Sequence, residues 1–271
     1  MGDGVRVAAP PVLMAVLPLL AAACEGDIFP PDALLRAGST FTNPGREEIE
    51  RCGGTNAAHL SAPLPGNSWV PLFDRVFDGR YPVINHFDHD QPHPFVDDNG
   101  FQVDWCGRLR TGQIDGHSGY DFVMPEGVPI RAAADGEVTF AGTDGPFHCP
   151  FEGEVRDQVK VDIVHLLPDG RRVVSTYKHL SYLVVTAKQP VLRGQIIALS
   201  GNTGCSTLPH LHFETWLLAG PAGTPVAIDP FGWQGQGADP WAEKPGGAAS
   251  IWLWRAGQAP DLSVKLAPAG R

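Results

Sequence analysis

Short runs in which apolar and polar residues alternate fill the chain from residue 112 onward. Alternation with a period of two places successive side chains on opposite faces of an extended strand. Turn segments such as Asp-Gly and Gly-Asn-Thr-Gly separate these runs, and Asp169-Gly170 between two valine-rich runs predicts a hairpin. The strands that we expect cover residues 128–133, 137–141, 159–165, 172–179, 196–200 and 210–217.

No long segment shows the helical period of 3.6 residues, so the pattern predicts a mainly β protein. We expect an antiparallel β-sheet domain with a groove over residues 112–235. Residues 142–158 predict a long loop at the rim of that groove. Residues 46–111 combine many turn signals with little periodicity and predict an irregular N-terminal extension. The Trp- and Gly-rich residues 236–271 predict a tail whose tryptophans either pack on the domain, which we favour, or edge a binding surface.

Composition agrees with short strands and limits the partners. The 271 residues include 32 glycines and 26 prolines, which is typical of many turns, and 43% hydrophobic residues allow a sizeable core. The formal net charge of −10 disfavours nucleic acid or an anionic membrane surface as a partner. A peptide substrate with charges of both signs stays compatible with this acidity.

The N-terminus has the pattern of an export signal. One arginine precedes a run of mostly apolar or small residues that is too short and too rich in proline to span a membrane. Cleavage after Ala23 would release a free secreted protein, whereas the residues before Cys24 resemble a bacterial lipobox, with Cys24 as the lipidated first residue. We expect residues 1–23 to be a signal peptide and residues 24–45 a tether, with a slight preference for lipidation.

The other four cysteines form an even set once Cys24 is set aside as a lipid anchor, as is typical of an exported protein with disulfides. Three pairings of these four are open. We expect Cys52–Cys106, which ties the extension to the start of the domain, and Cys149–Cys205, which joins two loops beside the groove. The alternative, buried free thiols, is disfavoured by export.

Candidate chemistry lies in the last predicted strand, where His210 and His212 flank a leucine. Because side chains alternate along a strand, both imidazoles point to one face. A second element upstream supplies His117 and, four positions later, Asp121. Histidines and a carboxylate in such a set suit a catalytic zinc ion with three protein ligands and one open position.

Three motifs in this order resemble peptidase family M23, the lysostaphin-like or LytM-type zinc metallopeptidases that cut peptidoglycan. The resemblance covers roughly residues 112–230 and includes the turn and strand sequences between the motifs. It implies a duplicated hybrid motif-like β fold with an active-site groove. The motifs are His117-Ser118-Gly119-Tyr120-Asp121, Tyr177-Lys178-His179-Leu180-Ser181 and His210-Leu211-His212.

The resemblance also implies the roles of five side chains. One Zn2+ per chain would be bound by His117, Asp121 and His212. His179 and His210 would stay unligated in the groove, where one moves the proton of the attacking water to the leaving amine and the other hydrogen-bonds the developing oxyanion. The resemblance does not divide these two roles between them.

Three residues near the His-x-His strand are candidates for supporting roles. Glu214 follows His212 with a period of two, so it either orients that imidazole or forms an ion pair elsewhere. Asn202 and Thr203 lie on the turn before the strand and are expected to line the substrate groove.

Residues 85–93 concentrate histidines, aspartates and an asparagine. We favour a polar loop capped by its own side chains over a second metal site. A third interpretation is a loop over the groove, which places Asn85 in contact with the substrate. His165 alternates with Ile163 and is expected to be structural.

These observations predict an exported bacterial zinc endopeptidase that hydrolyses peptide bonds in peptidoglycan crosslinks. We expect a periplasmic or extracellular monomer that touches the membrane only through a lipid anchor at Cys24, if one is attached. Two alternatives stay open. The first is a non-catalytic protein of the same fold that binds or activates cell-wall hydrolases, against which the presence of all five motif residues argues. The second is a zinc peptidase that acts on protein substrates.

Overall fold

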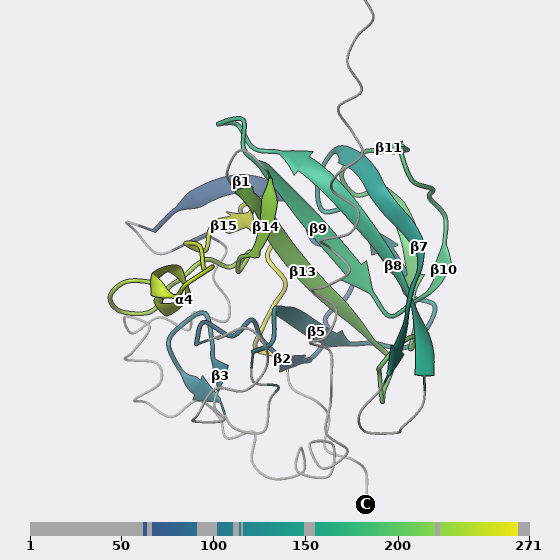
Figure 1. The fold of residues 1–271 in the computed structure, drawn as a ribbon, viewed down its shortest axis with the longest axis horizontal. Helices are drawn as coiled ribbons and strands as arrows, with labels where there is room; N and C mark the ends of the chain where they lie inside the picture. Colours follow the sequence, from purple (N-terminus) through teal and green to yellow (C-terminus); the bar gives the residue numbers. More distant parts are fainter. Residues whose placement is uncertain are drawn as a thin grey trace, which may run out of the picture.

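The computed structural model describes residues 62–63, 67–90, 102–110, 114, 116–148, 155–219 and 223–264. Eight strands form its largest sheet, namely β2 (Val83–Asn85), β5 (Gly119–Val123), β7 (Gly136–His148), β8 (Val155–Leu166), β9 (Arg172–Lys178), β11 (Pro190–Val191), β13 (His210–Ala219) and β14 (Thr224–Ala227). Their order is β11-β7-β8-β9-β13-β5-β2, with β14 beside β13 (Figure 1). Every pair is antiparallel, which confirms the predicted fold class.

The central strand β13 separates the core from the functional face of this sheet. Phe213 is buried, and its ring centroid lies 5.3 Å from that of Tyr177 in β9 and 6.2 Å from that of Phe73. Because successive side chains of a strand point to opposite faces, His212 lies on the other face of the sheet. The alternation read from the sequence therefore places the apolar residues in the core and both histidines on one side.

The hairpin predicted at Asp169-Gly170 joins β8 to β9, which pair in antiparallel register. Gly170 adopts φ 87°, a left-handed conformation that glycine reaches without the steric cost of a Cβ atom. The turn places β8 along one edge of β9. Strand β13 pairs with the opposite edge of β9.

Strands β7 and β8 are longer than the sequence predicts. We expected a loop over residues 142–158, but the described part of this segment continues both strands, so that prediction is wrong. The ladder between the strands has a register shift between Asp144 and Phe147. Gly145-Pro146, which looks like a turn in the sequence, lies at this irregularity, where a strand absorbs an extra residue without ending.

A smaller antiparallel sheet lies at the end of β9. It consists of β10 (Leu180–Leu183), β12 (Ile196–Ser200) and β6 (Pro129–Arg131), in the order β10-β12-β6. His179 is the single residue between β9 and β10, and its φ of 61° is left-handed. The chain turns from one sheet into the other at this histidine, so its side chain is positioned by a corner of the fold.

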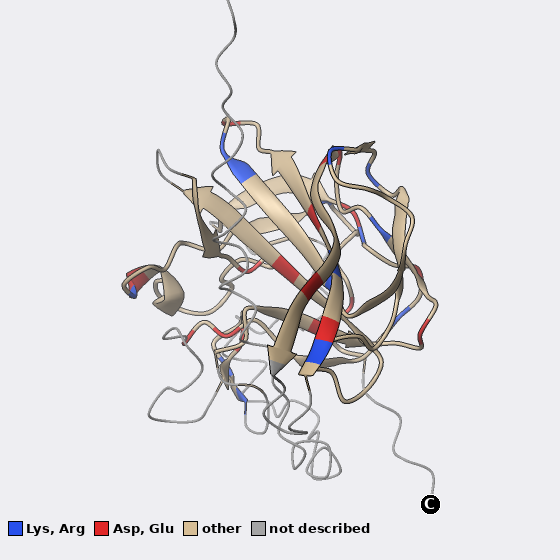
Figure 2. Ribbon diagram, turned by 45° about the vertical axis from the view of Figure 1, so that its right-hand side comes forward, with Lys and Arg blue, Asp and Glu red and all other residues tan. Residues whose placement is uncertain are grey.

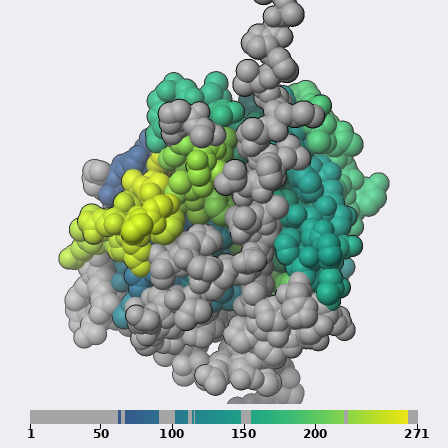
Figure 3. Space-filling model, in the orientation of Figure 1, coloured from purple at the N-terminus to yellow at the C-terminus, as the bar shows by residue number. Residues whose placement is uncertain are grey.

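The described parts of the extension and the tail pack together. Strand β1 (Trp69–Phe73) pairs in parallel with β15 (Trp252–Trp254), and Trp252 and Trp254 are buried. Figure 3 shows the yellow C-terminal segment against the purple β1. Strand β2 from the extension joins the large sheet beside β5. The remaining elements are β3 (Gln102–Val103), β4 (Leu109–Arg110) and the helix α4 (Pro240–Glu243).

Acidic and basic residues are interspersed on the strands of the large sheet (Figure 2). One example is Lys160 in β8, whose Nζ lies 3.0 Å from Asp144 Oδ2 and 3.3 Å from Asp162 Oδ2. Within the described ranges, no helix has the length and apolar character needed to cross a membrane. The predicted signal peptide, the tether and Cys24 lie outside the described residues.

Candidate metal centre

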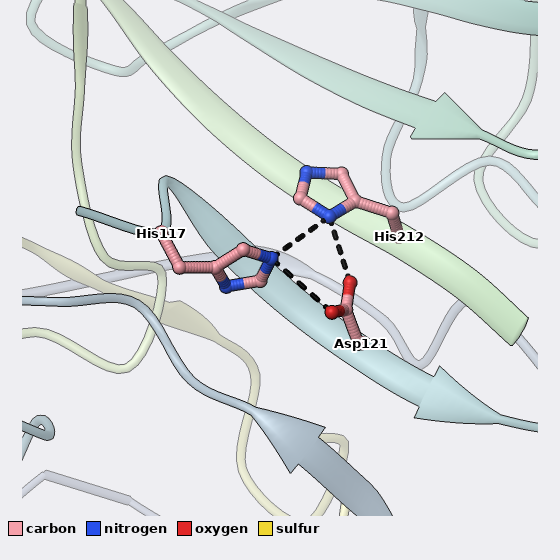
Figure 4. Close-up of side chains that lie close together, drawn as sticks. All are labelled: His117, Asp121 and His212. Atoms are coloured by element: carbon pink, nitrogen blue, oxygen red, sulfur yellow. Dashed lines mark hydrogen bonds and ion pairs between the residues drawn. The ribbon is translucent and has the colours of Figure 1, made fainter. Parts of the chain in front are cut away.

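Three side chains that the sequence predicts as metal ligands converge on one point at the centre of the large sheet (Figure 4). His212 in β13 lies directly opposite Asp121 in β5, and His117 lies just before β5. Nδ1 of His212 lies 2.8 Å from Asp121 Oδ1 and 3.1 Å from Nε2 of His117. That Nε2 lies 3.3 Å from Asp121 Oδ2, and all three side chains are buried.

This donor set fits one zinc ion. Ligand atoms held tetrahedrally at about 2.0–2.1 Å from zinc lie about 3.3 Å from one another. The two nitrogens lie 3.1 Å apart, and one ligand atom from each of the three residues lies within 4.8 Å of the others, so small shifts bring all three donors to coordination distance. Two nitrogens and a carboxylate oxygen suit zinc chemically, and three protein ligands leave one position open.

A hydrogen bond behind His117 and a carboxylate behind His212 determine which nitrogen of each ring faces the metal position. Nδ1 of His117 lies 2.9 Å from the backbone carbonyl of His86, which can only accept, so this nitrogen carries the proton and Nε2 keeps its lone pair. In His212 the arrangement is reversed, because Nε2 lies 2.8 Å from Glu214 Oε1 and Nδ1 faces the other ligands. Both imidazoles are therefore oriented for coordination.

Asn85 supports the third ligand, Asp121. Its Nδ2 donates to Asp121 Oδ2 at 2.6 Å, and its Oδ1 accepts from the backbone N–H of Ile114 at 2.9 Å. The side chain is buried behind the carboxylate, and its predicted contact with substrate stays a prediction. Burial opposes the ionisation of Asp121, but His117 and the other neighbouring histidines outweigh it and hold the pKa of this carboxyl well below its ordinary value.

His179 and His210 lie side by side next to the three ligands. Their ring centroids are 4.4 Å apart, and Nε2 of His210 lies 3.5 Å from Asp121 Oδ1. Nδ1 of His179 lies 2.7 Å from the carbonyl of Thr203, and Nδ1 of His210 lies 2.9 Å from that of Leu208. Because carbonyls only accept, each Nδ1 carries a proton, and the neutral imidazole presents the lone pair of Nε2.

Hydrogen bonds from the turn before β13 hold His179 and His210 in place. The hydroxyl of Thr203 donates to the carbonyl of Leu180 at 2.8 Å, which holds the Thr203 carbonyl on His179. Asn202 Oδ1 accepts from the Ser206 hydroxyl at 2.6 Å, and that hydroxyl lies 3.0 Å from Nδ1 of His210. Asn202 and Thr203 thus lie at the site, and their contact with substrate stays a prediction.

Glycine at position 119 allows β5 to approach β13 closely. A Cβ atom at Gly119 would lie 2.4 Å from the carbonyl oxygen of Phe213 and 2.9 Å from Cγ of Glu214. Any larger residue would push the two strands apart. This separation would also move Asp121 away from His212, so the glycine is part of what assembles the site.

Glu214 contacts a partner for each of the two roles that the sequence left open, and both roles stay predictions. It lies beside the imidazole of His212, and it forms a buried ion pair of 2.8 Å with Lys178. Sequence reasoning missed Lys178, although its place opposite His212 in the ladder between β13 and β9 puts both side chains on one face. Sequence reasoning also missed the backbone carbonyl of His86, which accepts a hydrogen bond from Nδ1 of His117 and which no residue pattern reveals.

The described residues of the 85–93 segment form a capped polar loop. Asp88 Oδ1 accepts from the backbone N–H groups of Asp90 and Val103 at 2.9 and 2.8 Å, and its Oδ2 accepts from that of Gly116 at 2.9 Å. His89 is buried between two aspartates of the tail. Within the described ranges, three potential metal ligands come together only at His117, Asp121 and His212.

The remaining predicted residues are only partly described. His165 is buried, with Nδ1 2.9 Å from the Asp135 carbonyl and Nε2 2.7 Å from the Ser175 hydroxyl. Cys106 and Cys205 are each disulfide-bonded. Their expected partners lie outside the described residues, so the pairing Cys52–Cys106 and Cys149–Cys205 stays a prediction.

Comparisons with known proteins support the same interpretation. Residues 115–228 match Peptidase family M23. Peptidoglycan DD-endopeptidase ShyA of Vibrio cholerae is 33% identical over 150 residues, which are 55% of this chain and 28% of that protein. Glycyl-glycine endopeptidase ALE-1 of Staphylococcus capitis is 40% identical over 98 residues, which are 36% of this chain and 24% of that protein. The chain thus spans about a quarter of the length of these curated relatives.

Among solved structures, the catalytic domain of lysostaphin from Staphylococcus simulans is similar, with 28% sequence identity and a TM-score of 0.36 over 56% of this chain and 90% of that chain. The site described above, with three ligand atoms around one point and two imidazoles beside them, has the composition of a mononuclear metallohydrolase centre. The match to peptidase family M23 over residues 115–228 includes all five of these side chains. Residues 115–228 of this chain therefore form a domain similar to peptidase family M23.

Proposed function

We propose that this protein is an exported zinc metalloendopeptidase that hydrolyses peptide bonds in peptidoglycan crosslinks. The observation that carries the proposal is the convergence of His117, Asp121 and His212, whose ligand atoms all lie within 4.8 Å of one another. The presence of His179 and His210 beside them supports catalysis rather than a purely structural metal site. A structural zinc usually has four protein ligands, whereas this set has three.

Zinc, when bound, supplies a Lewis acid that polarises the scissile carbonyl and makes a water molecule at the open position more acidic. The protein supplies the orientation of the three donors. The His86 carbonyl directs Nε2 of His117 to the site, and Asn85 holds the carboxylate of Asp121. These contacts orient the donors before the metal binds, so less reorganisation accompanies binding.

His179 and His210 move the protons of the reaction. Each has Nδ1 on a backbone carbonyl, so each neutral ring offers Nε2 as a proton acceptor. One of them takes a proton from the attacking water and delivers it to the leaving amine. The other acts in its cationic form, with both ring nitrogens protonated, and donates a hydrogen bond from Nε2 to the oxyanion that develops on the scissile carbonyl. Their ring separation of 4.4 Å allows both to reach the same peptide bond.

The substrate class follows from the relatives and from the N-terminal sequence. One relative is named a peptidoglycan DD-endopeptidase and another a glycyl-glycine endopeptidase, which supports a peptidoglycan peptide as substrate. Peptidoglycan lies outside the cytoplasmic membrane. The apolar N-terminal segment of this chain supports export to that compartment, either as a free protein or through lipidated Cys24.

Incubation of purified peptidoglycan with the protein tests the proposal. We expect new amino and carboxyl termini by mass spectrometry, blocked by a chelator and restored by Zn2+, and one zinc per chain by metal analysis. The matched control is His165→Gln, which alters a buried histidine outside the site and should cleave like the wild type. Full zinc occupancy in a variant carrying both Asp121→Ala and His212→Ala would overturn the ligand assignment.

Two other results would favour the alternatives. Cleavage of a glycine-rich polypeptide without cleavage of peptidoglycan would indicate a peptidase of protein substrates. Zinc binding at full occupancy with no cleavage of either would indicate a binding or activator protein.

A further inference from the structure

We propose that Lys178 and Glu214 form a positioning pair that sets the orientation of His212 and links it to the strand that carries His179. The inference rests on the proposed function, because it assigns a role in the same site. Neither residue reaches the point where the three donors meet, so both act through the side chains that they hold.

The contacts of Glu214 are with residues on three segments of the chain. Its Oε1 accepts from the Ser118 hydroxyl at 2.6 Å and from Lys178 Nζ at 2.8 Å, and it lies 2.8 Å from Nε2 of His212. Its Oε2 accepts from the indole N–H of Trp216 at 3.0 Å. Glu214 and Lys178 are each 1% exposed, so water does not substitute for these contacts.

The partners of the Glu214 carboxylate lie next to histidines of the site along the chain. Ser118 follows the ligand His117 directly, and Lys178 precedes His179 directly. Glu214 itself lies in β13, the strand that carries His210 and His212. A single buried carboxylate therefore joins the three segments that supply all the histidines of the site.

The charge of Lys178 explains why the Glu214 carboxylate can lie buried next to the candidate metal ligand His212. A buried carboxylate without a cation is costly, and it tends to change its position or its partners. Lys178 in β9 lies opposite His212 in the ladder, so its side chain extends over the same face and its ammonium group reaches Oε1. With the charge balanced in this way, Oε1 can remain next to Nε2 of His212, which keeps Nδ1 directed at the ligand cluster.

A second buried lysine on the same sheet offers a matched comparison. Lys160 in β8 pairs with Asp144 and Asp162 at 3.0 and 3.3 Å, and it is 4% exposed. Its two carboxylate partners lie on β7 and β8, and not on the strands that carry the metal ligands. Loss of Lys160 therefore breaks a buried ion pair of the same kind without removing any of the four partners of Glu214 named above.

The test compares Lys178→Met, Lys178→Arg, Glu214→Gln and the control Lys160→Met in the full chain. Zinc affinity is measured by competition with a chromogenic chelator, and the ligand geometry by the absorption spectrum of the cobalt-substituted protein. We expect Lys178→Met and Glu214→Gln to weaken zinc binding about 10–100-fold and to change the cobalt spectrum. Lys178→Arg should restore most of the affinity, and Lys160→Met should keep it. On a peptidoglycan peptide, kcat should fall while KM stays unchanged.

Unchanged zinc affinity and an unchanged cobalt spectrum in Lys178→Met and Glu214→Gln would overturn the inference. An equal loss in Lys160→Met would also overturn it, because the effect would then belong to any buried lysine of this sheet. If circular dichroism shows that Lys178→Met does not fold, the nearly isosteric Glu214→Gln decides the result. Zinc binding and cleavage by the wild type are scored separately, so a failure of the proposed function is distinguishable from a failure of this pair.

Discussion

Replacing His89 with glutamine should remove a pH-dependent contribution of about 3 kcal/mol to the free energy of unfolding. Nδ1 of His89 lies 2.7 Å from Asp239 Oδ1, and Nε2 lies 3.0 Å from Asp229 Oδ2. Tyr120 also donates to Asp229 at 2.8 Å. These contacts hold the 85–90 segment, whose Asn85 and His86 support the metal ligands, against the C-terminal tail.

The magnitude follows from the pKa of the buried imidazole. Burial by itself lowers the pKa of His89, but the hydrogen bonds and charges of Asp229 and Asp239 outweigh it and raise the pKa from 6.5 to about 9. At about 1.4 kcal/mol for each pKa unit, the rise in pKa from 6.5 to about 9 corresponds to about 3 kcal/mol. Because the pKa is higher in the folded chain, the stabilisation is complete below pH 6.5 and is lost as the pH rises to about 9.

Urea unfolding at several pH values between about 6 and 9.5, at constant salt and in chelator, measures this contribution. The chelator removes the pH dependence of metal binding from the comparison. We expect the difference in unfolding free energy between the wild type and His89→Gln to shrink by about 3 kcal/mol across this range. The control is His165→Gln, because burial lowers the pKa of His165 to about 4, so the folded ring stays neutral and this difference from the wild type changes only near pH 6, in the opposite direction. A difference between wild type and His89→Gln that is the same at both ends of the range would refute the reasoning.

Three further predictions concern the site and its supports. His179→Ala and His210→Ala should each keep one zinc per chain and lower kcat about 10²–10⁴-fold, as checked by metal analysis and peptide release; zinc loss in either variant would make that histidine a ligand. Asn85→Ala should weaken zinc binding about 10–100-fold in a chelator titration, because it removes the hydrogen bond to a ligand carboxylate; unchanged affinity would contradict this role. Peptide mapping without reductant should find Cys52–Cys106 and Cys149–Cys205, and any other pairing would refute the predicted bridges.

The strands were predictable where alternation is strong and turns are marked. The predicted strand at residues 196–200 has the bounds of β12, and the one at residues 210–217 corresponds to β13. The continuation of β7 and β8 was not predictable, because Gly145-Pro146 has the composition of a turn and only the opposite strand holds it in the sheet. The parallel pairing of β1 with β15 joins segments from opposite ends of the described chain, which no local pattern indicates.

Each half of the His117, Asp121 and His212 cluster was predictable because the spacing within that half is local. His210 and His212 share a face by the period of a strand, and His117 and Asp121 lie four residues apart. Their supports were not predictable, since Asn85 reaches Asp121 and Lys178 reaches Glu214 from other strands.

The sequence by itself determined the fold class, the candidate histidines and carboxylate of the centre, and the shared face of β13 on which His210 and His212 lie. These features depend on the order and period of residues within single strands, which an amino-acid sequence states directly. Only the tertiary structure decided which nitrogen of each imidazole faces the metal position, because that choice depends on the His86 carbonyl and on Glu214. It also decided that one buried carboxylate joins three distant segments, since contacts of this kind arise from the register between strands and not from the strands themselves.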